Sequence, residues 1–287
     1  MTKASSPQRY GLIAGNGRFP LLALESARQL GHQVVVVGIE GEASADVGRL
    51  AESLHWIHIG QLSKLIDILK QEGVREVMMT GQVKHVSIFS SLKPDWRLFK
   101  LLSGLKEKNT AALIGGIQRV LADEGIKLVD STRLLKPLLA GEGVLTKRKP
   151  NTDEEKDIRY GRRVAHALAS VDIGQSVAIS EKACVAVEAM EGTDEMLRRA
   201  ASLTNGRPLR LVKVSRGRGH LLFDVPVAGL GTIATMRDTN TTALAVDAGR
   251  TLLLDRKEMI HLANEAGITI IGFAPLEQDA EAGQGNT

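Results

Sequence analysis

A glycine turn near the amino terminus has the composition of a phosphate-binding loop. Gly15, Asn16 and Gly17 separate an apolar stretch at residues 11–14 from a segment typical of a helix. Glycines let backbone N–H groups approach a phosphate, and the dipole of a following helix favours the negative charge. Pro20 suits the first helical turn, because the N–H that it lacks would have no intrahelical partner. The turn therefore indicates a nucleotide phosphate, with a purely structural tight turn as the alternative.

A second group of residues surrounds the glycine turn that ends at Gly192. Glu188, Glu191 and Asp194 crowd this turn between an apolar stretch and an amphipathic one. Carboxylates at the start of a helix beside a glycine are suited to holding a hydrated divalent cation. This pattern makes Glu191 and Asp194 candidate metal ligands.

The same segment also has a simpler interpretation as an ordinary helix start. Thr193 or Asp194 would cap the helix, and Glu195 and Arg199 would form an ion pair along its surface. This interpretation explains most of the local pattern, but it leaves the crowding of Glu188 and Glu191 unexplained.

Asp224 and Lys213 are the remaining candidates. Asp224 stands between apolar residues and is followed closely by Pro226, a setting in which an aspartate usually caps a turn. Lys213 lies in the apolar stretch 211–214, where a lysine either covers apolar surface with its stem or meets a phosphate with its tip.

Several other chemistries are not indicated. The seven histidines are scattered, and His55 and His58 are spaced to point to opposite faces of a strand, so they cannot chelate one ion together. The sequence contains neither a GxSxG elbow nor a P-loop. Cys184 is the only cysteine and lies in an apolar run, which predicts a buried thiol and fits a reducing cytosol.

Alternating apolar and amphipathic segments predict an α/β protein with two halves. In the first half we expect strands at 11–14, 33–39 and 74–80, helices at 21–30, 61–70 and 110–124, and a Rossmann-like parallel sheet, because continuous Val-rich runs suit strands covered on both faces. In the second half we expect helices at 155–170, 194–201 and 257–266 and strands at 176–180, 184–188, 211–214, 251–254 and 268–272.

Glycines, a proline and adjacent charges without apolar periodicity mark a linker at residues 141–152. In this interpretation the Lys147, Arg148 and Lys149 run is solvated. We place the domains at 1–145 and 146–287, with a frayed polar tail from residue 276.

Composition limits the partners. The chain is 43% hydrophobic and 24% charged, as in ordinary globular proteins, and its 3% aromatic content argues against nucleic-acid modules that stack bases. A formal charge of +4 mildly favours anionic ligands or an anionic membrane surface. Because no stretch resembles a signal peptide or a membrane span, we expect a cytoplasmic protein that meets any membrane-borne substrate from the water side.

Six motifs, in order along nearly the whole chain, resemble the LpxI-type UDP-2,3-diacylglucosamine pyrophosphatase family. AVEAMEGTDEMLRR is the most specific of them. They are GLIAGNGRFP at 11–20, GQV at 81–83, DIGQSV at 172–177, AVEAMEGTDEMLRR at 186–199, FDVP at 223–226 and AGRTLLLDR at 248–256.

The resemblance implies a two-domain enzyme with a ligand cleft between the halves, which uses Mg²⁺ to split the substrate into UMP and 2,3-diacylglucosamine 1-phosphate in lipid A synthesis. It implies transient contact with the inner-membrane surface and leaves a homodimer open. The family's essential aspartate corresponds to Asp224, which becomes the expected catalytic residue and a metal ligand with Glu191 and Asp194. The expected substrate-binding residues are Gly15, Asn16, Gly17, Gln82, Gln175, Thr193 and Lys213.

One departure and two rival interpretations stay open. Many relatives carry paired aspartates where this chain has Asn109, Thr110 and Ala111. One rival is an NAD-dependent oxidoreductase in which Glu40 holds the ribose, although Pro20 replaces the third glycine of that fingerprint. The other is a carrier that binds a nucleotide or lipid without turnover.

Overall fold

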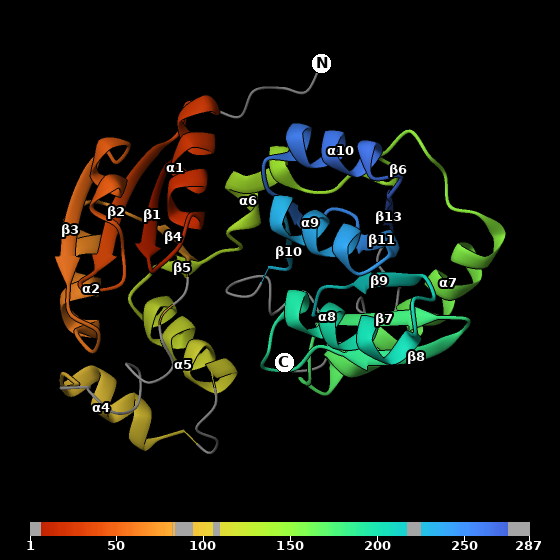
Figure 1. Ribbon diagram of the computed structural model, residues 1–287. Coiled ribbons are helices and arrows are strands. Elements are labelled where there is room, and N and C mark those ends of the chain that lie inside the picture. Colours follow the sequence, from red (N-terminus) through yellow and green to blue (C-terminus); the bar gives the residue numbers. More distant parts are fainter. Residues whose placement is uncertain (1–6, 82, 84–93, 106–109, 217–224, 275–287) are drawn as a thin grey trace. The chain divides into compact units, whose positions relative to one another are not determined.

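The structure is a computed structural model that describes residues 7–81, 83, 94–105, 110–216 and 225–274 (Figure 1). Helices alternate with largely parallel strands, which confirms the α/β class. Internal contacts divide the chain into two units, residues 1–135 and 136–287. The predicted boundary lies further along, after residue 145. The short strand β6 (Gly143–Val144) precedes it and pairs with a strand of the second unit.

The first unit is built on a five-stranded parallel sheet. Its order is β3-β2-β1-β4-β5, which matches the strand order of doubly wound sheets. The strands are β1 (Arg9–Ala14), β2 (Gln33–Ile39), β3 (Ser53–Ile57), β4 (Glu76–Thr80) and β5 (Lys127–Leu128). The Val-rich run of β2 is buried throughout after its first residue, as expected for a strand that is covered on both faces.

Helices of the first unit connect these strands. They are α1 (Phe19–Gln29), η1 (Ala45–Arg49), α2 (Leu62–Gln71), α4 (Trp96–Ser103), α5 (Thr110–Asp123) and α6 (Thr132–Leu135). The apolar residues of α2 that recur at helical spacing, Leu65, Ile66 and Leu69, are all buried. The expected helices at 21–30, 61–70 and 110–124 are confirmed to within about two residues at each end.

The second unit contains a six-stranded mixed sheet in the order β6-β13-β11-β9-β7-β8. Its strands besides β6 are β7 (Ser176–Ser180), β8 (Ala183–Val187), β9 (Leu209–Lys213), β11 (Thr241–Asp247) and β13 (Thr269–Phe273). Strands β9, β11 and β13 run parallel to one another. Strand β6 pairs antiparallel with β13, β7 pairs antiparallel with β9, and β8 pairs antiparallel with β7. Strand β11 lies inside this sheet, although the sequence pattern did not predict it.

Helices cover both faces of this second sheet (Figure 1). On one face, α7 (Thr152–Ser170) packs Ile158 and Ala165 against Val212 and Ala245. On the other face the helices are α8 (Thr193–Thr204), α9 (Leu230–Asp238) and α10 (Arg256–Glu265), which enclose a core that includes Leu211, Leu244 and Ile270. A two-stranded pair, β10 (Val227–Ala228) with β12 (Leu252–Leu253), and the short helix η2 (Lys136–Leu138) complete the unit.

The segment interpreted as a solvated linker is instead fastened to the second unit. Arg148 donates to both carboxylate oxygens of Glu154 at 2.8 and 2.9 Å, and to the carbonyl oxygens of Thr242 and Gly267 at 2.6 Å. Glu154 also completes a capping box with Asn151 at the start of α7. The linker interpretation is therefore wrong for Arg148, because two of its partners, Thr242 and Gly267, lie far along the chain and leave no local pattern.

Candidate active site

One edge of the second sheet collects most of the candidate residues that belong to this unit. Ser176 at the start of β7 pairs with Lys213 at the end of β9, and Lys213 pairs with Val246 near the end of β11. Asp247 in turn pairs with Phe273 at the end of β13. We call this the carboxyl edge, since the parallel strands β9, β11 and β13 end there. Ligands of α/β sheets bind outside the carboxyl ends of the strands.

Lys213 is a buried cation at the centre of this edge. Its residue is only 7% exposed. Its Nζ donates to Ser176 Oγ at 3.1 Å and to Thr193 Oγ1 at 2.8 Å, and lies 3.6 Å from Glu188 Oε2. The ammonium group of Lys213 is therefore buried at this edge, with two hydroxyl groups and a carboxylate among its partners.

Thr193 links this lysine to the helix behind it, but it does not cap that helix. The N-cap is Gly192 at φ +86°, and no side chain caps the start of α8. The Thr193 hydroxyl instead donates to Glu188 Oε1 at 2.8 Å. The predicted cap is thus wrong, because the hydroxyl is used in a tertiary contact.

Glu191 is held by partners in its own turn and in helix α8. Its carboxylate accepts from Arg199 at 2.5 Å and from the Ala189 N–H at 3.0 Å. Hydrogen bonds from its own backbone, from Arg199 and from Ala189 hold the pKa of Glu191 below its usual range. The predicted Glu195–Arg199 pair is wrong, since Glu195 pairs with Arg198 at 2.5 Å.

Two of the three carboxylates around this turn are engaged by cations. Within the part of the chain that the structure describes, no three His, Cys, Asp or Glu side chains gather closely enough to hold a metal ion. Glu188 is engaged by Lys213 and Glu191 by Arg199, while Asp194 is half-buried at the start of α8. Mg²⁺ is usually bound through one or two protein carboxylates and keeps several waters, so the role of Asp194 as a metal ligand stays a prediction.

Two loops at the carboxyl edge touch and expose apolar side chains. Gly174 lies so close to the backbone of Glu188 that a Cβ on it would come within 1.8 Å of the Glu188 carbonyl oxygen. Val171 and Ile173 are exposed on the first loop, and Met190 is 100% exposed on the second. Gln175 follows directly, and its carbonyl oxygen accepts from the Val214 N–H at 2.8 Å.

Asp247 is a buried acid at this edge that the sequence patterns did not single out. Asp247 is 0% exposed, and its Oδ2 accepts from the backbone N–H and the hydroxyl of Ser215 at 2.9 and 3.3 Å. Its Oδ1 lies 3.4 Å from His166 Nε2 and 3.9 Å from Arg162 Nη2, both on α7. Burial lowers the pKa of Arg162, and Asp247 opposes that shift. An acid directly after the apolar run 243–246 was the available signal.

Other candidates lie outside the described residues. Asp224 and Gln82 are in this group, as is Asn109 of the segment where relatives carry paired aspartates. Thr110 and Ala111 open helix α5. The roles predicted for Asp224 and Gln82 stay predictions.

The glycine turn of the first unit follows β1, as expected. The Gly15 N–H donates to the Thr80 carbonyl oxygen at 2.8 Å, and Gly17 adopts φ +98°. A Cβ on Gly81 would come within 2.6 Å of the Asn16 carbonyl oxygen, which explains why the GQV motif opens with glycine. Asn16 and Gly17 are exposed, so the turn is open to a ligand.

The structure also gives the partners of Glu40 and of the two neighbouring histidines, and the exposure of Cys184. Glu40, the ribose ligand of the oxidoreductase interpretation, pairs with His58 at 3.1 Å, whereas His55 pairs with Glu72. The two histidines thus have separate partners, as their spacing predicts. Cys184 is only half-buried, which corrects the expected buried thiol, and burial raises its pKa.

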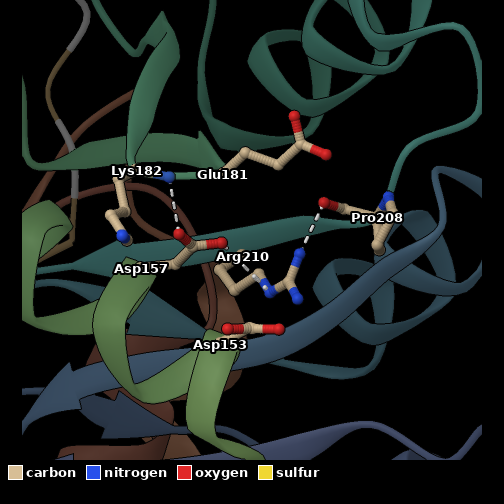
Figure 2. Close-up of a pocket in the computed structure, with 6 residues that line it drawn as sticks. All are labelled: Asp153, Asp157, Glu181, Lys182, Pro208 and Arg210. Carbon is tan, nitrogen blue, oxygen red and sulfur yellow. Dashed lines mark hydrogen bonds and ion pairs between the residues drawn. The ribbon is translucent and has the colours of Figure 1, made fainter.

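A pocket of about 370 Å³ lies at the opposite edge of the sheet, where β9 begins (Figure 2). We call this the amino edge. Arg210 lies 3.5 Å from Asp157 Oδ2 and donates to the Pro208 carbonyl oxygen, while Asp157 also accepts from the Lys182 N–H at 2.7 Å. The buried charged groups of this pocket therefore engage one another. Its lining residues are Asp153, Asp157, Glu181, Lys182, Pro208 and Arg210.

None of the helices in the described ranges combines the length and the apolar character needed to cross a membrane.

Comparison with known proteins gives matches over nearly the whole chain. The model of the LpxI N-terminal domain matches residues 9–147, and that of the LpxI C-terminal domain matches residues 141–271. A curated relative from Caulobacter vibrioides, the UDP-2,3-diacylglucosamine pyrophosphatase LpxI, is 30% identical over 281 residues. The alignment covers 94% of this chain and 99% of the relative.

Solved structures resemble the chain only weakly. Bordetella bronchiseptica WbmG in complex with NAD and UDP is 12% identical, with a TM-score of 0.29 over 44% of this chain and 37% of WbmG. An ADP complex of purK is 14% identical, with a TM-score of 0.29 over 70% of this chain and 37% of purK. The chain thus spans little more than a third of these structures, and the similarity supports no argument about ligands.

Proposed function

Since the chain belongs to the LpxI family, we propose that it hydrolyses the pyrophosphate bond of UDP-2,3-diacylglucosamine and releases UMP and 2,3-diacylglucosamine 1-phosphate in lipid A biosynthesis. The curated relative from Caulobacter vibrioides carries this substrate in its name and aligns along almost its full length. The reaction and its products are thereby proposed for this chain as well.

The observation that carries the proposal is the buried Lys213 at the carboxyl edge. Pyrophosphate hydrolysis needs charge to be neutralised on the phosphoryl oxygens and a water held in line for attack. A fixed cation in a site of low dielectric supplies the first requirement at little reorganisation cost. Glu188 forms an ion pair with Lys213, so an incoming phosphate would compete with Glu188 for this cation.

The attacking water is assigned to Asp224. Arg216 is the last described residue after β9, and Asp224 follows within the segment that joins the carboxyl edge to β10. An ionised aspartate accepts a hydrogen bond from water and orients its oxygen toward phosphorus. This role rests on the family motif FDVP, since Asp224 lies outside the described residues.

The exposed apolar side chains at the same edge suit a diacylated substrate. Val171, Ile173 and Met190 lie on two loops in contact, beside Gln175 and Thr193. Each methylene of an acyl chain that leaves a bilayer needs about 0.8 kcal/mol of replacement apolar contact. We assign the acyl chains to this surface. The turn at Gly15, Asn16 and Gly17 is assigned to the uridine nucleotide, and a cleft between the halves stays a prediction.

Mg²⁺ is the proposed cofactor. When bound, it would neutralise phosphoryl oxygens as a Lewis acid. Asp194 and Asp224 are the proposed ligands, and Glu191 joins them only by leaving Arg199. Chelation by EDTA should abolish UMP release, and added Mg²⁺ should restore it. Full activity in EDTA would rule out the cofactor without touching the role of Lys213.

The test of the proposed function is UMP release from UDP-2,3-diacylglucosamine in detergent micelles. We expect turnover by the wild type and a loss of about three orders of magnitude in kcat for Asp224→Ala, with an unchanged melting temperature. Asp194→Ala is the matched aspartate variant for the metal role. Binding without turnover by the wild type would indicate a carrier, and full activity of Asp224→Ala would remove that residue from the reaction.

A further inference from the structure

Helix α4 presents two aromatic side chains to solvent. Trp96 is 74% exposed and Phe99 is 51% exposed, and their rings stack with centroids 6.0 Å apart at an interplanar angle of 25°. Among the residues that the structure describes, these are the only large aromatic side chains that are exposed. Scattered exposed leucines need no explanation, but two neighbouring exposed aromatic rings indicate a contact surface.

The inner face of α4 packs against the rest of its unit, so the exposed rings on its outer face are not core residues left uncovered. Leu98 is buried, and Leu101 packs against Gly116 of α5, where an added Cβ would come within 3.0 Å of it. The helix start is fixed by Asp95, whose carboxylate accepts from the N–H groups of Leu98 at 3.0 Å and Ser63 at 2.6 Å. The aromatic rings are thus held outward on a helix anchored to α2.

Basic charge accompanies the rings. Lys100 is exposed one residue after Phe99, on the same outer face. The sequence from residue 84 to residue 108 contains six Lys or Arg and two Asp or Glu, a net charge of +4 that equals the formal charge of the whole chain. The carboxylate of Glu124 forms ion pairs with Arg97 and, at 2.6 Å, with Lys70. The two acidic residues of the segment, Asp95 and Glu107, thus leave a basic excess in its sequence.

We propose that the outer face of α4, formed by Trp96, Phe99 and Lys100, docks the protein on an anionic lipid bilayer. Tryptophan and phenylalanine partition into the boundary between headgroups and acyl chains, and lysine pairs with anionic headgroups. A second protein chain would bury the same rings, but it would not require the basic excess. The proposal deepens the proposed function, because a diacylated substrate resides in such a bilayer, and it predicts a binding event that can be measured without turnover.

The test is co-sedimentation of the full chain with vesicles of mixed phosphatidylglycerol and phosphatidylcholine. We expect binding that falls about tenfold in Trp96→Ala/Phe99→Ala and less in Lys100→Glu. Vesicles of phosphatidylcholine alone should bind the wild type weakly. The matched control is Leu203→Ala, which removes an exposed apolar side chain from α8 in the second unit and should bind as the wild type does.

Two further measurements keep the outcomes apart. UMP release in detergent micelles should be unchanged by Trp96→Ala/Phe99→Ala, whereas release from vesicle-borne substrate should fall with binding. If the chain proves inactive but its vesicle binding still depends on the two rings, the proposed function fails and the docking surface stands. Equal vesicle binding by the wild type and the double variant would overturn docking, as would a wild-type dimer that the double variant converts to monomer.

Discussion

Strand β9 carries a buried cation at each of its ends, and the two are built differently. Arg210 at the amino edge pairs with Asp157 of α7, which is also bound by the Lys182 N–H of the β7–β8 turn. Lys213 at the carboxyl edge pairs with Glu188 and is held by two hydroxyls, from Ser176 and Thr193. Arg210 thus ties α7 and the β7–β8 turn to the sheet. Lys213 is bound by hydroxyl groups and a carboxylate, whose place a phosphate ligand can take.

Burial and charge therefore do not identify an active site by themselves. The amino edge has a pocket and several ionised groups, including Glu154 and Arg148, yet these groups are paired with one another. The carboxyl edge lies where the parallel strands β9, β11 and β13 end together and where β7 begins. The direction of the parallel strands decides between the two.

The largest effect is expected from Lys213→Met. Loss of the cation should lower kcat/KM for UMP release by about 10²- to 10³-fold, as for other fixed groups that stabilise developing charge. The variant should also lose about 3–5 kcal/mol of unfolding free energy, because the largely buried Glu188 loses its cation and keeps the bond from the Thr193 hydroxyl. Adding Glu188→Gln should recover stability in urea unfolding without recovering activity. Recovery of both would make Lys213 purely structural.

Arg210→Met should cost a similar 3–5 kcal/mol in unfolding free energy, since it strands the buried Asp157. Its kcat/KM at a temperature where it is folded should stay within about twofold of the wild type, because the amino edge takes no part in the reaction. Urea unfolding and steady-state kinetics check the two halves of this prediction. A large kinetic defect in a folded Arg210→Met protein would erase the distinction between the edges.

A smaller effect is expected from Asp247→Asn. Ser215, two residues after the end of β9, is fixed by Oδ2 of Asp247, and loss of the charge should loosen the strand end beside Lys213. We expect kcat/KM to fall roughly tenfold through mispositioning, with KM less affected. The matched control is Ser215→Ala, which keeps the backbone N–H contact and should fall less. An unchanged kcat/KM would limit the active edge to the Lys213 side.

The smallest effect concerns the clamp at Glu154. Burial opposes ionisation of this group, but hydrogen bonds from Arg148, Thr242 and the Asn151 N–H bring its pKa below the ordinary 4.5. A lowered folded-state pKa gives stability that is present above pH 4.5 and is lost as the pH falls through the folded value. Glu154→Gln should therefore cost about 1 kcal/mol at pH 7, and the difference from wild type should shrink in acid. A difference that grows on acidification would contradict the sign.

Local patterns predicted much of the fold. Strand β2 has the predicted bounds, because a Val-rich run is recognisable without its neighbours. Strand β11 was missed because its short run of Ala, Leu and Val follows polar residues, and only its place inside the sheet buries it. Helix α4 was missed as well, since Trp96 and Phe99 disturb the expected division into apolar and polar faces.

The candidate site could be predicted only in part. Thr193 was singled out at a predicted helix start and Lys213 within a predicted strand, and the structure joins them by a hydrogen bond. The partners of Glu188 and Glu191 could not be predicted, because the choice between Lys213 and Arg199 depends on how the turn folds back over β9. Tertiary contacts of this kind have no signal in sequence spacing.

The most direct test of the account compares two charge-balanced double variants in one UMP-release assay. Lys213→Met/Glu188→Gln removes the pair at the carboxyl edge, and Arg210→Met/Asp157→Asn removes the pair at the amino edge. With both proteins folded, we predict that the first loses at least about 100-fold in kcat/KM, while the second stays within about twofold of the wild type. Equal losses, or a larger loss at the amino edge, would contradict the assignment of the reaction to the carboxyl edge.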